Sequence, residues 1–92
     1  MGATKTEQEV EVLEEQLLNH VLMVYNDDIN SFEHVIDSLI KICKHAKEQA
    51  EQCAMLVHTK GKCDVKHGEF DELLPMKRAL NKLGITANIE DC

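Results

Sequence analysis

The first regular element that the pattern of apolar and polar positions predicts is a strand. Residues 20–25 read HVLMVY, a short apolar run rich in strand formers, which is typical of a buried strand. The run ends at Asn26-Asp27-Asp28, and these residue types favour turns because their side chains bond nearby backbone groups. We therefore expect a buried strand that leads directly into a polar turn.

The next apolar positions recur at helical spacing. From Phe32 to Cys43 they follow the i, i+3, i+4, i+7 rule, which predicts a helix that runs to about Lys44. Asn30 precedes Glu33 by three residues, and this spacing resembles a capping box at a helix start. The helix is therefore expected to begin just after the polar turn.

A second helix is predicted over residues 47–60. One of its faces carries small apolar side chains, namely Ala50, Cys53, Ala54 and Val57. Gly61 is a natural C-cap for this helix, because glycine enters the left-handed region without a steric penalty.

The remaining residues predict two more strands around a third helix. Residues 63–66 alternate and indicate a short strand, and residues 67–68, His-Gly, are typical of a turn. A third helix fits residues 70–84, with the glycine at its end, provided that Pro75 lies in its first turn or kinks it. Alternation at residues 85–89 predicts the last strand.

This order, β-α-α-β-α-β, indicates the α+β class. We expect a single domain over residues 20–92, with three helices packed on a three-stranded antiparallel sheet. Residues 1–19 hold five glutamates against one lysine and are expected to form an acidic flexible N-terminal extension. Its thin apolar stripe would suit a short helix or a tail that orders only on a partner.

Composition narrows the classes of function. A chain of 92 residues has no room for a second core, and its core must be aliphatic because only three aromatics are present. The net charge of −7 argues against nucleic acid and against an anionic membrane surface, and it suits a positively charged partner. No apolar stretch is long enough to span a membrane, and the polar start is unlike a targeting signal. A cytoplasmic location is therefore expected.

Cysteine and histidine spacings give no sign of a metal site or of catalysis. Cys43, Cys53, Cys63 and Cys92 form no CxxC pair, so reduced thiols are expected, and no zinc pattern is present. Cys53 and His58 would point apart on one helix and cannot form a nucleophile–base pair. We expect no metal, no cofactor and no enzymatic activity.

The Asn26-Asp27-Asp28 cluster has two interpretations. Its acceptors could bind a cation or an ammonium group, or they could serve only the turn and the start of the helix. His58 could likewise be a satisfied, half-buried residue or a functional group. The apolar stripes of the first two helices could be core alone, or they could also line a small pocket beside the turn.

Two runs of sequence resemble the ClpS family, the bacterial adaptors of the Clp protease. They are VYNDDINSFEHVID at residues 24–37 and QAEQCAMLVHTKGKC at residues 49–63. The family signature is a strand ending in NDD, a helix with an apolar face, and a second helix ending in V-H-x-x-G. The resemblance covers about residues 20–90 and implies the same β-α-α-β-α-β fold.

The resemblance implies a binding function without catalysis. ClpS proteins bind the free N-terminal residue of N-degron substrates and deliver them to an AAA+ unfoldase. It implies that Asn26, Asp28 and His58 hold the substrate α-ammonium group, with Asp27 nearby, since that group has N–H donors only. The side-chain pocket that it implies is formed by Asn30, Phe32, Val35, Ala54, Val57 and Ile85.

Ligands and partners follow from the same resemblance. The expected ligands begin with Phe, Tyr, Trp or Leu, and the expected partner is the N-terminal domain of a Clp unfoldase, which the acidic extension would engage during delivery. Phe32 stands where the family usually has a methionine rim residue, so it should exclude side chains branched at Cβ. Ala54 replaces another methionine and should widen the pocket. The alternative is a structural interaction module, with an exposed apolar patch and no recognition of N-termini.

Overall fold

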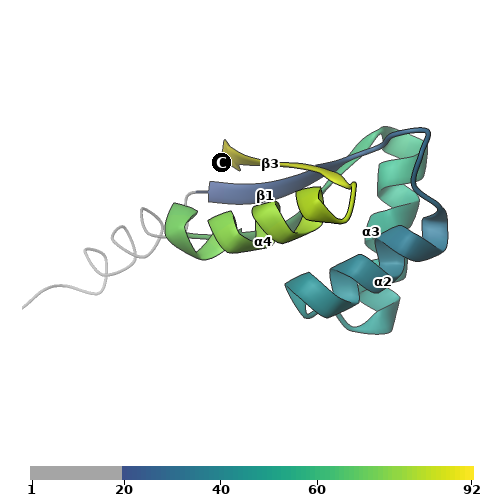
Figure 1. Cartoon of the computed structure of the whole chain (residues 1–92), viewed down its shortest axis with the longest axis horizontal. Helices are drawn as coiled ribbons and strands as arrows, with labels where there is room; N and C mark the ends of the chain where they lie inside the picture. The colour runs from purple at the N-terminus through teal and green to yellow at the C-terminus, as the bar shows by residue number, and fades with distance from the viewer. Residues whose placement is uncertain (1–19) are drawn as a thin grey trace, which may run out of the picture.

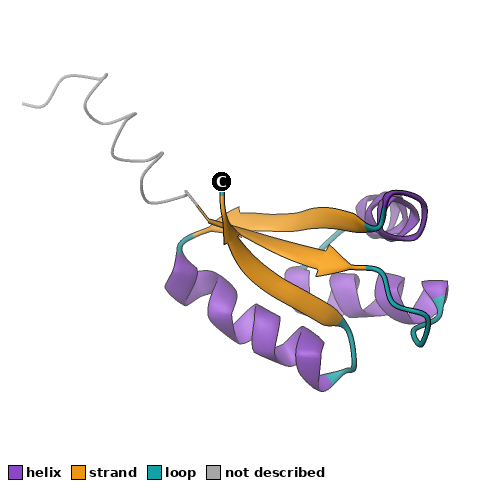
Figure 2. Cartoon of the chain, turned by 90° about the horizontal axis from the view of Figure 1, so that it is seen from above, coloured by secondary structure: helices purple, strands orange, loops and turns teal. Residues whose placement is uncertain are grey.

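The computed structural model describes residues 20–92, and the expected extension over residues 1–19 lies outside them. The elements follow the predicted order. They are β1 (His20–Tyr25), α2 (Phe32–Cys43), α3 (Lys47–Lys60), β2 (Lys62–Gly68), α4 (Phe70–Lys82) and β3 (Thr86–Asp91). The predicted α+β class, with three helices on a three-stranded antiparallel sheet, is confirmed (Figure 2).

Strand β1 is the centre of the sheet. The strand order is β2-β1-β3, and β1 pairs antiparallel with both neighbours. Helix α4 runs along the sheet, whereas α2 and α3 lie together beyond the end at which β1 stops (Figure 1). The loop that leaves β1 therefore enters the region where α2 and α3 meet.

The core is aliphatic, as the composition requires. Its largest fully buried side chains come from the sheet and from two of the helices. They are Leu22, Leu39, Leu73, Leu80, Val24 and Cys43. Both phenylalanines remain largely exposed, so neither of them is a core residue.

The expected turn at residues 67–68 is wrong, because these residues belong to β2. His67 pairs with Val21 and Gly68 with His20. A bulge opposite Leu22 adds one residue to β2 and allows the pairing to continue. The carbonyl of Val65, in this bulge, accepts a hydrogen bond of 2.7 Å from Nε2 of the buried His45.

Two further expectations for the helices are corrected. Ser31, not Asn30, caps α2, because its Oγ accepts a hydrogen bond of 3.1 Å from the His34 N–H. Pro75 lies beyond the first turn of α4, and the helix continues through it from Phe70 to Lys82. The proline costs α4 one hydrogen bond to the carbonyl of Asp71, an exposed residue that water can reach.

Gly84 ends α4 in the left-handed conformation, with φ of 86°. Its N–H donates to the Asn81 carbonyl, and the Ile85 N–H donates to the Leu80 carbonyl, both at 3.0 Å, which is the Schellman pattern. Ile85 is consequently buried between α4 and β3, and the last strand begins one residue later than expected, at Thr86.

The loop between β1 and α2 is held by the Asp27 carboxylate. This group accepts hydrogen bonds from the Ile29 N–H (3.0 Å), the Asn30 N–H (2.9 Å) and Asn30 Nδ2 (2.7 Å). The bond from the Asn30 backbone is the main cause that lowers the pKa of Asp27, and partial burial opposes it. Asp27 is therefore ionised at neutral pH, and its carboxylate is occupied by hydrogen bonds within the loop.

The same loop is tied to the turn between α4 and β3. Asn30 Nδ2 also donates to the Gly84 carbonyl at 2.7 Å. His34 Nε2 donates to the neighbouring Leu83 carbonyl at 2.9 Å. These two bonds fix the beginning of α2 against a segment about 50 residues away in sequence.

Asp27→Ala should lower the free energy of unfolding by about 1–2 kcal/mol at neutral pH, because three N–H donors lose their acceptor. The folded pKa lies below the ordinary value of 3.8, so this stabilisation is present above that value and is lost as the pH falls through the folded pKa. In urea unfolding, the difference in stability between the wild type and the variant should therefore shrink as the pH falls below about 5. Asp28→Ala is the control and should not change stability; a difference that is independent of pH would refute the role of the Asp27 charge.

Gly84→Ala should destabilise the protein by about 1 kcal/mol, because an L-residue is strained at this positive φ. The new Cβ would lie 3.8 Å from Asn30 Oδ1, an ordinary contact, so the cost is conformational. Gly68→Ala is the matched control. There φ is not in the left-handed region, and the Cβ displaces only the flexible end of Glu72. Equal melting temperatures for the two variants would contradict this assignment.

Candidate functional site

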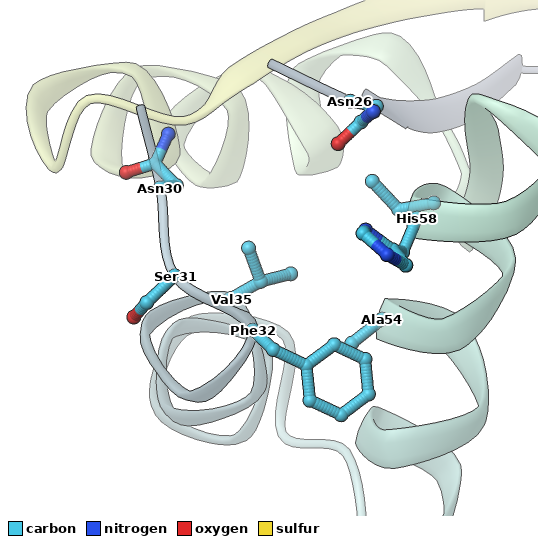
Figure 3. A pocket seen from close by; sticks show the side chains of 8 residues that line it. Asn26, Asn30, Ser31, Phe32, Val35, Ala54 and His58 are labelled. Carbon is cyan, nitrogen blue, oxygen red and sulfur yellow. The ribbon is translucent and has the colours of Figure 1, made fainter. Parts of the chain in front are cut away.

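A narrow pocket of about 30 Å³ lies between the end of β1, the start of α2 and the second half of α3 (Figure 3). This volume holds roughly one or two water molecules. The lining residues are Asn26, Asn30, Ser31, Phe32, Val35, Ala54, Val57 and His58. Most of the residues that the sequence marks as candidates therefore meet at one place.

Backbone hydrogen bonds place the polar end of the pocket. The Asn26 N–H donates to the Gly61 carbonyl at 2.9 Å, which joins the end of β1 to the end of α3. Gly61 has φ of 91°, and its N–H donates to the Val57 carbonyl at 3.0 Å. This C-cap, which the sequence predicted, keeps Asn26 beside the last turn of α3, where His58 lies.

The floor of the pocket is apolar. Val35 comes from α2, and Ala54 and Val57 come from α3; all three are buried. The same side chains belong to the hydrophobic core that packs α2 against α3. The sequence left open whether the apolar stripes are core alone or also line a pocket. These three residues do both.

Phe32 lies at the mouth of the pocket. Its side chain is 40% exposed, and its ring stands next to Ala54 (Figure 3). The ring takes the place beside the small Ala54 side chain, so the wide cavity that the sequence suggested is not formed. In this conformation the pocket is too small for an aromatic side chain.

Asn26 and His58 line the polar end of the pocket with side chains that are not hydrogen-bonded to the described residues. Both residues are exposed, and the His58 ring points into the pocket (Figure 3). His58 is therefore not a satisfied, half-buried histidine. An amide oxygen and an imidazole nitrogen are available here to accept hydrogen bonds from a ligand.

Three of the predicted residues do not line the pocket. Asp27 directs its carboxylate to the loop, and Ile85 is buried in the core beside the end of α4. Asp28 is exposed, with no hydrogen bond or ion pair to the described residues. Its charge is therefore available in the loop that follows Asn26, although its side chain is outside the pocket. Their roles in ligand binding stay predictions.

Ser31 lines the pocket but was not among the predicted residues. Its place between Asn30 and Phe32 was the available signal, since both neighbours were candidates. The hydroxyl is occupied as the N-cap of α2, so Ser31 orders the helix start that carries Phe32.

The buried cysteines have the properties of small apolar residues. Burial raises the pKa of Cys43 to about 11 and that of Cys63 to about 12, so both thiols are protonated at neutral pH. Within residues 20–92 no group of His, Cys, Asp and Glu is arranged to hold a metal ion. In the same range, no helix has the length and apolar character needed to cross a membrane.

Comparison with known proteins extends the resemblance seen in the sequence. The family described as ATP-dependent Clp protease adaptor protein ClpS matches residues 14–87. The ATP-dependent Clp protease adapter protein ClpS of Corynebacterium diphtheriae is 30% identical over 84 residues, which is 91% of this chain and 74% of the relative.

A solved structure shares the fold. ClpS2 of Agrobacterium tumefaciens, bound to L-phenylalaninamide, superposes with a TM-score of 0.71 at 18% identity, covering 83% of this chain and 99% of that one. The names of the family and of the Corynebacterium relative describe adaptors rather than enzymes. The chain therefore belongs to the ClpS family of adaptors of the Clp protease.

Proposed function

We propose that this chain binds a free N-terminal Phe, Tyr, Trp or Leu of N-degron peptides and proteins in the cytoplasm. It delivers them to the N-terminal domain of a Clp AAA+ unfoldase. The observation that carries the proposal is the unpaired polar end of the pocket, Asn26 and His58, above an apolar floor. This arrangement fits a ligand with one cationic end and one apolar end.

The ammonium group is assigned to the polar end. It offers three N–H donors and no acceptor, so it needs acceptor atoms and negative charge around it. The Asn26 amide oxygen and a neutral His58 nitrogen supply acceptors, and the exposed Asp28 carboxylate supplies charge at the rim. Asp27 contributes its charge from within the loop, because its oxygens are already hydrogen-bonded.

The N-terminal side chain is assigned to the apolar floor. The narrow pocket admits a large side chain only when the Phe32 ring turns outward, and Phe32, at the first position of α2, is already partly in solvent. The displaced ring then packs against the side of the ligand near its Cβ. A related solved structure, ClpS2, holds L-phenylalaninamide, a molecule with a free amino group and an aromatic side chain.

The alternative is an interaction module that does not recognise N-termini. It draws support from exposed apolar side chains near the pocket, which include Ile29 and Met55. The two functions differ in one measurable property, since only the adaptor function depends on a free α-amino group.

A labelled peptide that begins with Phe should bind, and the same peptide acetylated at its N-terminus should bind at least about tenfold more weakly. Acetylation removes the positive charge and two of the donors while the side chain is kept. Fluorescence anisotropy titrations measure both affinities. Equal affinities, or no binding of the free peptide, would reject the proposed function.

Asp28→Ala should reduce the affinity of the free peptide about tenfold, because the variant lacks a charged partner for the ammonium group. The acetylated peptide should show no such change. Asp37→Ala removes a different exposed carboxylate, which lies on α2. This variant is the control for net charge and should leave the affinity unchanged. An Asp28→Ala protein with wild-type affinity would show that Asp28 does not supply the negative charge that faces the ammonium group.

Phe32 should determine which first residues are accepted. We expect peptides that begin with Phe to bind about tenfold more tightly than those that begin with Val or Ile, because the displaced ring crowds a branched Cβ. Phe32→Ala should bring the affinities for Phe and Val within about threefold of one another. Phe32→Met, which keeps bulk at the rim, is the control and should retain the discrimination. Tight binding of Val by the wild type would contradict this role.

A further inference from the structure

The outward face of α3 carries two exposed apolar side chains. Met55 is 51% exposed and Leu56 is 43% exposed. With Glu51 and Gln52, which also belong to α3, they line a shallow hollow that is open to solvent. These residues take no part in the pocket for the N-terminal side chain.

This hollow is continuous with the pocket. A second hollow, of about 340 Å³, is lined by Asn30, Phe32, Met55 and His58. It shares Asn30, Phe32 and His58 with the narrow pocket and shares Met55 with the larger hollow on α3. A track therefore leads from the polar end of the pocket along α3.

The length of the track matches a short piece of extended peptide. Glu51, Met55 and His58 are four and three residues apart, so they lie on one face of α3. Seven residues of helix span about 10 Å. An extended chain advances about 3.3 Å per residue, so roughly three peptide residues cover this distance.

We propose that Glu51, Met55 and Leu56 form a second subsite for residues two to four of the bound peptide. The proposal rests on the proposed function and deepens it by naming the sequence that follows the N-terminal residue. Met55 and Leu56 favour apolar side chains at positions two and three. Glu51, at the far end of the track, favours a basic side chain at position four and disfavours an acidic one.

The test compares labelled peptides that differ only at these positions. Phe-Leu-Leu-Lys should bind the wild type about five- to tenfold more tightly than Phe-Ser-Ser-Lys, with the same tail on both. Replacing the lysine by glutamate should weaken binding about threefold, and Glu51→Gln should remove most of that difference.

The double variant Met55→Ser/Leu56→Ser should bind the Leu-Leu and Ser-Ser peptides equally and keep wild-type affinity for the Ser-Ser peptide. Ile40→Ser removes an apolar side chain of 36% exposure from α2 and is the matched control, which should retain the preference for Leu-Leu. Circular dichroism verifies folding. If the double variant does not fold, the proposal is decided by the affinities of the wild type and of Met55→Ser for the Leu-Leu and Ser-Ser peptides.

The outcomes separate the subsite from the proposed function. If the Ser-Ser peptide binds only with a free N-terminus, and the Leu-Leu peptide binds no better, the subsite is wrong and the function stands. If no peptide binds, both are wrong. A dimer in sedimentation that the double variant dissociates would assign these side chains to self-association and overturn the subsite.

Discussion

The Asn30 carboxamide joins the two parts of the chain on which the pocket depends. Its Nδ2 donates to both Asp27 and the Gly84 carbonyl at 2.7 Å, so one side chain fixes the loop after β1 and the turn after α4. The start of α2, with Ser31 and Phe32, follows directly. Without this bridge only the His34 bond to the Leu83 carbonyl would hold the start of α2 to the turn after α4, whereas Asn26 is held beside α3 by its own bond to the Gly61 carbonyl.

The apolar floor of the pocket is made of residues that the small core also needs. Val35, Ala54 and Val57 pack α2 against α3, and they also form the pocket floor. A large permanent cavity at this place would forfeit packing contacts between the helices. The Phe32 ring lines the same narrow pocket and stands at the surface, where it is 40% exposed.

The sequence predicts the elements well wherever periodicity or glycine chemistry is local. The C-cap at Gly61 and the helix end at Gly84 need nothing beyond the conformational freedom of glycine. The predictions are wrong where the local structure depends on a hydrogen-bond partner that is distant in sequence. Asn30 has the chemistry of a cap, but its amide nitrogen donates to the Gly84 carbonyl, and α2 begins one residue later than that cap requires, so Ser31 accepts the capping bond. Likewise His67 is typical of a turn, but pairing with β1 extends the strand through it.

The same distinction applies to the candidate site, where the sequence gives the residue types and the fold decides which of them are hydrogen-bonded. Asp27 and Asp28 are adjacent and chemically identical, so their residue type gives no reason to separate them, and only the family resemblance implied different roles for the two. The loop separates them, because three N–H donors occupy the Asp27 carboxylate and none occupies that of Asp28. An exposed, unpaired carboxylate, amide and imidazole are stable without a ligand because water solvates them. An ammonium group bound as proposed would therefore have only to replace that water at the polar end, and no hydrogen bond of the fold would have to break there.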